Sequence, residues 1–411
     1  MHKKSRRATC VHFIFTFTTL ALVLIYAPRL RRVHAQDGPA IVFVDAYATY
    51  QFNTLKNPTG LLWLPRAPSG SILFIADSGR HVIRSFDPTT AQLSTIAGTL
   101  DSAGYANGGA GSAQFNYPTG LGGEARIWCG QTGCNQYNQY GACISPIISC
   151  YNGYVLHIND SQNYVVRKLC TGQENQNSGD CSGQMGMVTT IAGNNSKGYV
   201  DGSAQSASFA SMGGHTDCSG LCYLTDAENH CLRSEDASGN VTTFAGTGYP
   251  GFVDGYRTSA LFNVPGKVSP DGSGNMYVAD IGNNAIRKID SSGYVTTLAG
   301  GGPNQIGLVD GSGSSASFYR PTSLVFNTTD GTLYVADSNN HCIRRIDANG
   351  NVTTYAGTGQ AGLVDGSLSQ AQFNGPTELV ISDGYMYISD SMNNVIRRID
   401  MSNGIVSTYI S

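Results

Sequence analysis

The chain has 411 residues, of which 41% are hydrophobic and only 13% are charged, and it contains 51 Gly. Long runs of helix-forming residues are missing, while Gly and Tyr are frequent, so the composition argues against a mainly helical protein. A chain of this length can bury a large core, and this one favours many short strands joined by turns.

Residues 1–35 differ from the rest of the chain. Four basic residues precede an apolar run at 8–27, and Val33 and Ala35 fit the −3 and −1 positions of a signal-peptide cut before Gln36. The run is also about 20 residues long, which is enough to span a bilayer. The segment is therefore read as a cleaved signal peptide or a retained membrane anchor, with a buried soluble helix as the third alternative. Under either of the first two interpretations, residues 36–411 lie outside the cytosol.

Without this segment the chain keeps 18 basic and 28 acidic residues, a formal charge of −10, and no cluster of Lys and Arg. That balance argues against nucleic-acid binding. We expect a protein that is secreted or lies on the extracellular face of a membrane, and that touches the membrane only if residues 1–35 are retained.

Cysteine usage agrees with export, because ten of the 11 Cys follow residue 35 and eight of these fall between 129 and 222. In an oxidising compartment this pattern indicates disulfides. A zinc site is the rival interpretation, but the spacings do not repeat a C-x-x-C pattern. The disulfide candidates are Cys129, Cys134, Cys143, Cys150, Cys170, Cys181, Cys218 and Cys222. Five N-x-S/T sequons give candidate glycosylation sites at Asn159, Asn194, Asn240, Asn327 and Asn351.

From residue 77 onward, an Asp followed seven residues later by an Arg recurs six times. The pairs are Asp77/Arg84, Asp160/Arg167, Asp226/Arg233, Asp280/Arg287, Asp337/Arg344 and Asp390/Arg397. Successive Asp residues are 83, 66, 54, 57 and 53 positions apart, a period typical of propeller blades. We expect the carboxylate to accept N–H groups of the turn that follows it, and the Arg to reach an acidic or carbonyl partner. Six copies argue against a catalytic pair, because catalysis needs one site.

Each unit contains four strand signals, which in the fifth copy are residues 321–326, 333–337, 342–347 and 351–357, separated by turn residues. Four antiparallel strands make one sheet that cannot bury both faces alone, so such sheets stack around an axis. The predicted fold is an all-β, six-bladed β-propeller of four-stranded antiparallel blades over residues 36–411.

A second signature, Asp-Gly followed by small residues and Phe, lies between the units. Its aromatic residues, expected to plug the space between sheets, are Phe115, Phe209, Phe262, Phe318 and Phe373. Calcium binding by the Asp residues of this signature is the alternative, but a lone Asp-Gly lacks the several oxygen ligands that calcium takes. Residues 42–53, with Asp45 and Phe52, are a further copy, so the ring is expected to close by docking this connector against the sixth blade.

The recurring "YVAD-x-x-N-[HN]-x-I-R" and "V-x-T-x-AG" elements resemble NHL repeats over residues 42–411, weakly in the second and third units. The resemblance implies a propeller that is often six-bladed and that acts in most members as an interaction platform. One branch, similar to peptidyl-hydroxyglycine lyases, is enzymatic and holds a metal with His residues near the axis.

The histidines offer little support for such an enzyme. His81, His230 and His341 occupy a repeat position in the turn after the Asp, where a structural role is expected. His157 lies where other units carry Tyr or Phe, and His215 takes the place of an aliphatic residue of the first strand without a clear Glu or Asp partner. No metal site, cofactor or catalytic residue is predicted, and Cys231 and Cys342 are expected to be free, buried thiols.

We therefore predict a monomeric binding module for an extracellular protein or glycan. The alternative is a propeller lyase or hydrolase with a metal-assisted site at one axial mouth. The recognition face is placed at extra residues in the second unit, at 122–151 and 170–186, and at the neighbouring loop of the third, with Trp128, Tyr137 and Tyr140 as binding candidates. A neutral insertion, stapled against proteolysis, is the rival interpretation.

Overall fold

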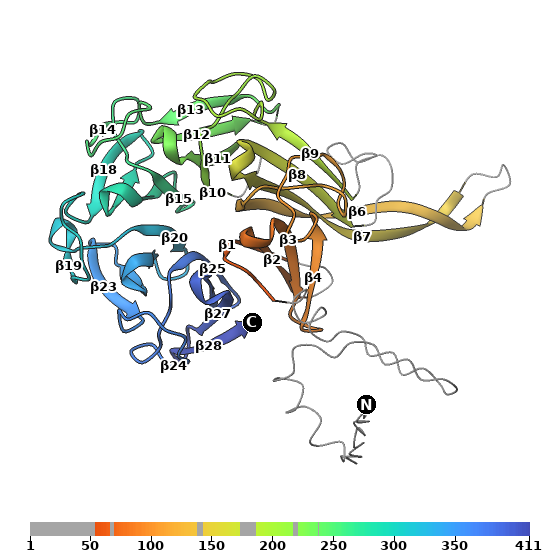
Figure 1. Ribbon diagram of the computed structural model, residues 1–411. Coiled ribbons are helices and arrows are strands. Elements are labelled where there is room, and N and C mark those ends of the chain that lie inside the picture. Colours follow the sequence, from red (N-terminus) through yellow and green to blue (C-terminus); the bar gives the residue numbers. More distant parts are fainter. Residues whose placement is uncertain (1–53, 66–69, 138–142, 173–185, 217–220, 237) are drawn as a thin grey trace, which may run out of the picture. The chain divides into compact units, whose positions relative to one another are not determined.

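The computed structural model describes residues 54–65, 70–137, 143–172, 186–216, 221–236 and 238–411 (Figure 1). For Glu124, 126–137, 143–153 and Gly172 it describes the backbone alone. The described residues belong to one compact unit, Tyr50–Ser411. Within them, no helix is long and apolar enough to cross a membrane. The predicted signal or anchor at 1–35 and the connector copy at 42–53, with Asp45 and Phe52, lie outside the described residues.

Six antiparallel sheets form the six predicted blades, so the predicted propeller is confirmed. Blade one holds β1 (Pro58–Pro65), β2 (Ser71–Asp77), β3 (Val82–Asp87) and β4 (Gln92–Ala97). Blade two holds β5 (Gly108–Gly109), β6 (Pro118–Tyr137), β7 (Cys143–Asp160), β8 (Val165–Gly172) and β9 (Met187–Ala192). Blade three holds β10 (Met212–His215), β11 (Leu221–Asp226), β12 (Cys231–Asp236) and β13 (Val241–Ala245).

The last three blades repeat the pattern. Blade four holds β14 (Gly255–Tyr256), β15 (Pro265–Pro270), β16 (Met276–Asp280), β17 (Ala285–Ile289) and β18 (Tyr294–Ala299). Blade five holds β19 (Gly311–Ser312), β20 (Pro321–Asn327), β21 (Thr332–Asp337), β22 (Cys342–Ile346) and β23 (Asn351–Ala356). Blade six holds β24 (Gly366–Ser367), β25 (Pro376–Ser382), β26 (Tyr385–Asp390), β27 (Val395–Asp400) and β28 (Ile405–Ile410).

Four blades have a fifth strand that the sequence did not predict. The short strands β5, β14, β19 and β24 come from the connector that precedes each blade and pair with its outermost strand. In blade three a single bridge, Gly202 to Val241, takes this place. Because the connector pairs with the sheet, it covers an edge that would otherwise expose unpaired N–H and C=O groups.

A short 3₁₀ turn joins the second and third strands of every blade. The turns are η1 (Ser78–Arg80), η2 (Ser161–Asn163), η3 (Ala227–Asn229), η4 (Ile281–Asn283), η6 (Ser338–Asn340) and η7 (Ser391–Asn393), and a further turn, η5 (Gly313–Ser315), lies in a connector. The residue after each of the six turns is left-handed, with φ between 49° and 60°: His81, Tyr164, His230, Asn284, His341 and Asn394. Asn and His tolerate this conformation better than most residues.

These left-handed residues also link neighbouring blades. The Nδ1 atoms of His81, His230 and His341 accept the N–H groups of Tyr117, Val264 and Gly375, each at 3.1 Å. Asn284 Oδ1 accepts the N–H group of Arg320 in the same way. The expected structural role of the three turn histidines is therefore confirmed.

The repeated Asp and Arg are buried and bonded to each other. In blades two to six the Arg Nη1 donates to the Asp Oδ2 at 2.8–3.1 Å, and both side chains are fully buried. The five bonded pairs are Asp160/Arg167, Asp226/Arg233, Asp280/Arg287, Asp337/Arg344 and Asp390/Arg397. The prediction that the Arg reaches an acidic or carbonyl partner is thus confirmed for these blades, and the acidic partner is the Asp of the same repeat.

The other oxygen of each Asp bonds the connector rather than the turn. Asp337 Oδ1, for example, accepts Tyr319 N at 2.8 Å. The prediction that the carboxylate caps the turn's own N–H groups is wrong, because none of the six turns has such a bond. The Asp instead ties the turn to the connector.

The second guanidinium nitrogen reaches the Asp-Gly signature. In blade five, Arg344 Nη2 donates to Asp310 Oδ1 at 2.9 Å and to the carbonyl of Val309. Equivalent bonds join Arg167 to Asn107, Arg233 to Asp201, Arg287 to Asp254 and Arg397 to Asp365. In blade one, Asp77 accepts Lys56 N, and Arg84 Nη1 donates to Thr95 Oγ1.

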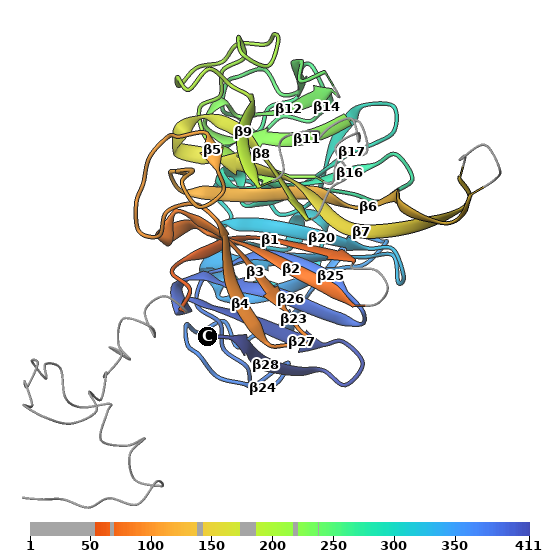
Figure 2. The ribbon, with the colours of Figure 1, turned by 90° about the vertical axis from the view of Figure 1, so that its right-hand side faces the viewer.

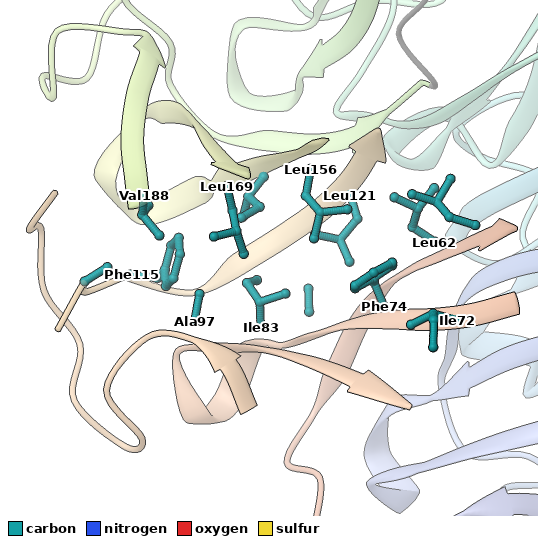
Figure 3. Packing of buried hydrophobic residues seen from close by; sticks show 14 residues of the cluster. Leu62, Ile72, Phe74, Ile83, Ala97, Phe115, Leu121, Leu156, Leu169 and Val188 are labelled. Atoms are coloured by element: carbon teal, nitrogen blue, oxygen red, sulfur yellow. The ribbon is translucent and has the colours of Figure 1, made fainter. Parts of the chain in front are cut away.

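The connector Phe residues lie fully buried beside this network, as predicted. In blades two to six each ring lies under the Arg of its blade, with Arg344 Cζ 5.1 Å from the centre of the Phe318 ring. Figure 3 shows the packing around Phe115, where side chains of blades one and two face one another, among them Ile83, Leu169 and Val188. The apolar core is thus divided into clusters between blades.

The ring closes between blades one and six. The first strands follow one another around the axis, and β1 lies beside both β6 and β25. Asn394 Oδ1 accepts Asn57 N at 2.7 Å, which repeats the bond that links the other blades. Trp63 stacks on Tyr387 with 4.4 Å between ring centres. Closure among the described residues therefore uses the same contacts as the other interfaces.

We expect Phe318→Ala to lower the free energy of unfolding by about 3–5 kcal/mol, because the truncation leaves a cavity between two sheets. Chemical denaturation measures the change. Tyr319→Ala is the matched control, because its side chain is 38% exposed and it should shift stability by less than about 0.5 kcal/mol. Equal stabilities for wild type and Phe318→Ala would contradict the assignment of Phe318 to the core.

Arg344→Met should cost about 3–5 kcal/mol, because it leaves the buried Asp337 carboxylate without its cation. The neighbouring Arg345 is exposed, so Arg345→Met serves as the control and should be close to neutral. Thermal melts of the two variants compare the costs directly. A smaller loss for Arg344→Met than for Arg345→Met would refute the role given to the buried pair.

Candidate functional site

The insertion predicted as a loop at 122–151 is a two-stranded ribbon. β6 and β7 pair from Pro118 and Asp160 outward to Tyr137 and Cys143. β8 accompanies β7 only as far as Gly153, so the outer part has two strands and extends away from the ring (Figures 1 and 2). The first two strands of blades five and six have only six or seven residues each. The extra length is therefore specific to blade two.

Two of the three predicted binding residues lie on the outer part of β6, where Trp128 pairs with Tyr151 and Tyr137 with Cys143 of β7. The side chains of Trp128 and Tyr137 are not described, and Tyr140 lies outside the described residues. The backbone register does set Cys129 opposite Cys150 across the ribbon. Most of the second predicted insertion, 173–185, is likewise outside the described part.

The cysteines whose side chains are described fall into two classes. Cys231 and Cys342 are free and buried, as predicted, whereas Cys170 and Cys222 are disulfide-bonded. Cys181 and Cys218 lie outside the described residues, and for Cys129, Cys134, Cys143 and Cys150 the backbone alone is described. Burial raises the pKa of the Cys231 and Cys342 thiols far above the usual value, so both stay protonated and unreactive.

One predicted glycosylation site is wrong. Asn159 is fully buried, and its side-chain amide donates to the carbonyls of Gly213 and Gly214 in blade three. A glycan has no space there in the folded protein. Asn194, Asn240 and Asn351 are exposed and Asn327 is half-buried, so these four stay predictions.

The interface of blades two and three contains a cluster of metal-ligating side chains. His157, His215, Cys222 and Glu235 each bring one such atom within 4.8 Å of the others. The rings of His157 and His215 are 5.7 Å apart, and Cys222 Sγ lies 3.7 Å from His157 Nδ1. The sequence suggested no acidic partner for His215, and Glu235 corrects that expectation.

Blade three supplies three of these residues from adjacent strands. His215 ends β10, and Cys222 on β11 lies directly opposite Glu235 on β12. His157 comes from β7 of blade two, where it is paired with Gly122 of β6. A side chain at Gly122 would collide with His215, because a Cβ atom there would lie 2.4 Å from His215 Nδ1. This glycine lets the two blades approach closely enough to bring the cluster together.

Burial changes the protonation of the cluster. His215 is 3% exposed, and burial with the nearby His157 lowers its pKa to about 3. It is therefore neutral at physiological pH, the form in which imidazole binds a metal. Glu235 is also 3% exposed, and burial raises its pKa to about 7. Its Oε2 atom is buried and has no hydrogen-bond partner among the described residues.

Apart from the cluster between blades two and three, a buried ion pair joins two of the first strands, which follow one another around the axis. The third residues of the six first strands are Gly60, Gly120, Gly214, Lys267, Ser323 and Glu378. Lys267 of blade four donates to Glu378 of blade six, and both side chains are largely buried. This pair links two blades that are not neighbours in the ring.

Comparison with known proteins supports the architecture. The NHL repeat model matches residues 318–346. The chain is 27% identical over 355 residues to "Protein SUPPRESSOR OF QUENCHING 1, chloroplastic" of Arabidopsis thaliana, covering 81% of this chain and 29% of that protein. It is 26% identical over 380 residues to NHL repeat-containing protein 2 of Gallus gallus, covering 82% and 46%. The chain thus spans less than half the length of these relatives.

Among solved structures, an auxiliary nutrient binding protein from Bacteroides ovatus aligns with a TM-score of 0.55 at 17% identity, covering 86% of this chain and 70% of the other. A protein of the same description from Bacteroides thetaiotaomicron gives 0.54 at 16% identity, covering 87% and 70%. Identities this low support the fold alone. Together with the repeat match, they confirm the resemblance to NHL-repeat propellers.

Proposed function

We propose that this chain is an exported NHL-type propeller that binds an extracellular protein or glycan through one face at blades two and three. The observation that carries the proposal is the ribbon formed by β6 and β7. Its outer strand segment from Arg126 to Tyr137 has 12 residues, which corresponds to about 40 Å of extended chain.

The ribbon has the properties of a recognition element. A two-stranded ribbon is only marginally stable by itself in water, and both of its edges present unpaired N–H and C=O groups to which another chain can add a strand. The other blades show that the fold does not need it, because blades five and six make the same connection with short turns. A role in binding therefore explains the presence of the ribbon better than a requirement of the fold does.

The neighbouring connections lie on the same side of the ring. In a four-stranded antiparallel blade, the connection between strands one and two and that between strands three and four leave from the same end. The β6–β7 ribbon, the β8–β9 connection and the β10–β11 connection all belong to this end. The eight clustered cysteines lie in or beside these segments, and disulfides there would reduce the entropy lost when the segments bind a partner.

Export rests on the N-terminal segment and the cysteines. The register that sets Cys129 opposite Cys150 places their Cα atoms within the range that a disulfide can span. An enzymatic site at an axial mouth has less support, because His215, the candidate ligand on a first strand, is only 3% exposed.

Replacing residues 124–149 with an Asn-Gly turn should leave the propeller folded and abolish binding. We suggest measuring binding of the labelled, purified protein to the surface of the cells that secrete it, by flow cytometry, beside a thermal melt. The expected result is an unchanged melt and at least a tenfold loss of apparent affinity. Unchanged affinity in a folded variant would refute the recognition face.

The matched control changes another connection at the same end of the ring. Asp383 and Gly384 join β25 to β26, both with positive φ. Asp383→Asn produces an Asn-Gly turn there without changing its length. This variant should bind like wild type, which separates loss of the ribbon from a general effect of editing such turns.

Counting the free thiols tests whether the protein is exported to an oxidising compartment, and this test does not depend on partner binding. The mature protein, denatured without reductant, should show two free thiols, Cys231 and Cys342, and the folded protein should show none because both are buried. A chromogenic disulfide reagent measures the number. Eight or more thiols after denaturation would indicate a reducing compartment and contradict export.

A further inference from the structure

We propose that His157, His215 and Glu235 bind one zinc ion between blades two and three. The site is independent of the partner-binding function proposed above, because it lies inside the blade interface rather than on the ribbon. The inference rests on the geometry of the cluster, on a comparison among the six repeats, and on the charge that the cluster buries.

The geometry suits a small cation. One potential ligand atom from each residue lies within 4.8 Å of the others, and the three side chains converge from β7, β10 and β12. Tetrahedral zinc holds N and O ligands at about 2.0–2.2 Å, so these ligand atoms need only close together by about 1 Å. Rotation about side-chain bonds provides such a movement.

Comparison among the repeats shows that the cluster replaces an apolar core. The positions of His215, Cys222 and Glu235 are apolar in every other blade, as the strand register shows. They are Leu61, Leu73 and Phe86; Leu121, Leu156 and Leu169; Val268, Met276 and Ile289; Leu324, Leu333 and Ile346; and Leu379, Met386 and Ile399.

His157 fits the same comparison. Its position is Phe74 in blade one and Tyr in the four remaining blades. At the interface of blades five and six, Tyr334, Leu379, Met386 and Ile399 all belong to one buried apolar cluster. The fold therefore accepts an apolar group at each of these positions, and the exchange for ligating groups at one interface requires another cause.

Charge gives the third argument. Burying a carboxylate without a partner is costly, and Glu235 Oε2 has none among the described residues. The nearby cation, Lys267, is bonded to Glu378. A bound divalent ion would give the Glu235 carboxylate a partner, and the imidazoles of His157 and His215 lie close enough to complete its coordination.

The types of ligand atom in the cluster indicate which metal ion it would bind. Two imidazoles and one carboxylate are typical ligands of zinc, whereas calcium and magnesium prefer oxygen ligands alone. Cys222 lies beside the site, but it is disulfide-bonded and a thiolate is the form that binds metal. Three protein ligands thus leave a fourth position for water or another small ligand.

The test is zinc binding by the full chain produced in a secreting host. After EDTA treatment and buffer exchange, zinc is titrated in and the bound metal is measured by mass spectrometry, together with the melting temperature. We expect about one zinc ion per chain and a melting temperature raised by a few degrees. A wild-type chain that binds no zinc at micromolar concentration would overturn the proposal.

The variant His215→Leu/Glu235→Ile restores the apolar residues of the other blades, and His157→Tyr does the same on the facing blade. Both should fold, because the other interfaces accept these residues, and both should bind less than a tenth of the wild-type zinc. In EDTA the double variant should melt no lower than wild type. Full zinc stoichiometry in either variant would place the ion elsewhere and refute the site.

His81→Asn is the matched control. His81 occupies the left-handed turn position, where blades four and six carry Asn284 and Asn394, so the substitution removes a histidine without disturbing the fold. It should retain about one zinc ion per chain and the same thermal shift. Loss of zinc in this control would show that binding does not depend on the cluster and would contradict the proposal.

Discussion

The structure depends on a buried ion pair that, in blades two to six, joins the turn to the connector before it. In blade five the Asp337 carboxylate accepts Arg344, Asn340 and the backbone of Tyr319, while Arg344 also reaches Asp310 and covers Phe318. A buried pair adds little stability by itself, but here its groups have several partners. Because one partner comes from the blade and another from the connector, the pair fixes where each connector lies. Repeated around the ring by Arg167, Arg233, Arg287 and Arg397, it sets the blade-to-blade register.

The regular part of this design could be predicted from the sequence. The seven-residue spacing of Asp and Arg, the recurring Phe and the alternating strand signals identified the blades and their core. The bonds from Asp and Arg to the connector could not be predicted, because they join residues at least 16 positions apart. The ribbon was read as a loop for a similar reason, since Gly, Cys and Asn in 122–151 resemble turn residues while cross-strand pairing determines their conformation.

The cluster at blades two and three shows what a search for motifs misses. His157, His215 and Glu235 are 20 to 78 positions apart and match no metal-binding spacing. They can be found by comparing the repeats, because Glu235 stands where five other blades carry Phe, Leu or Ile. Blade three thus keeps the network that builds the ring and changes the apolar residues that pack against blade two, beside the ribbon that distinguishes blade two from the others.

The claim that this interface departs from the others for a function is tested most directly by diffraction from zinc-soaked crystals at the zinc absorption edge. We predict an anomalous peak about 2.0–2.2 Å from His157, His215 and Glu235, and none at the equivalent interface of blades five and six. An interface without a peak, with Glu235 paired to another protein group instead, would contradict this account.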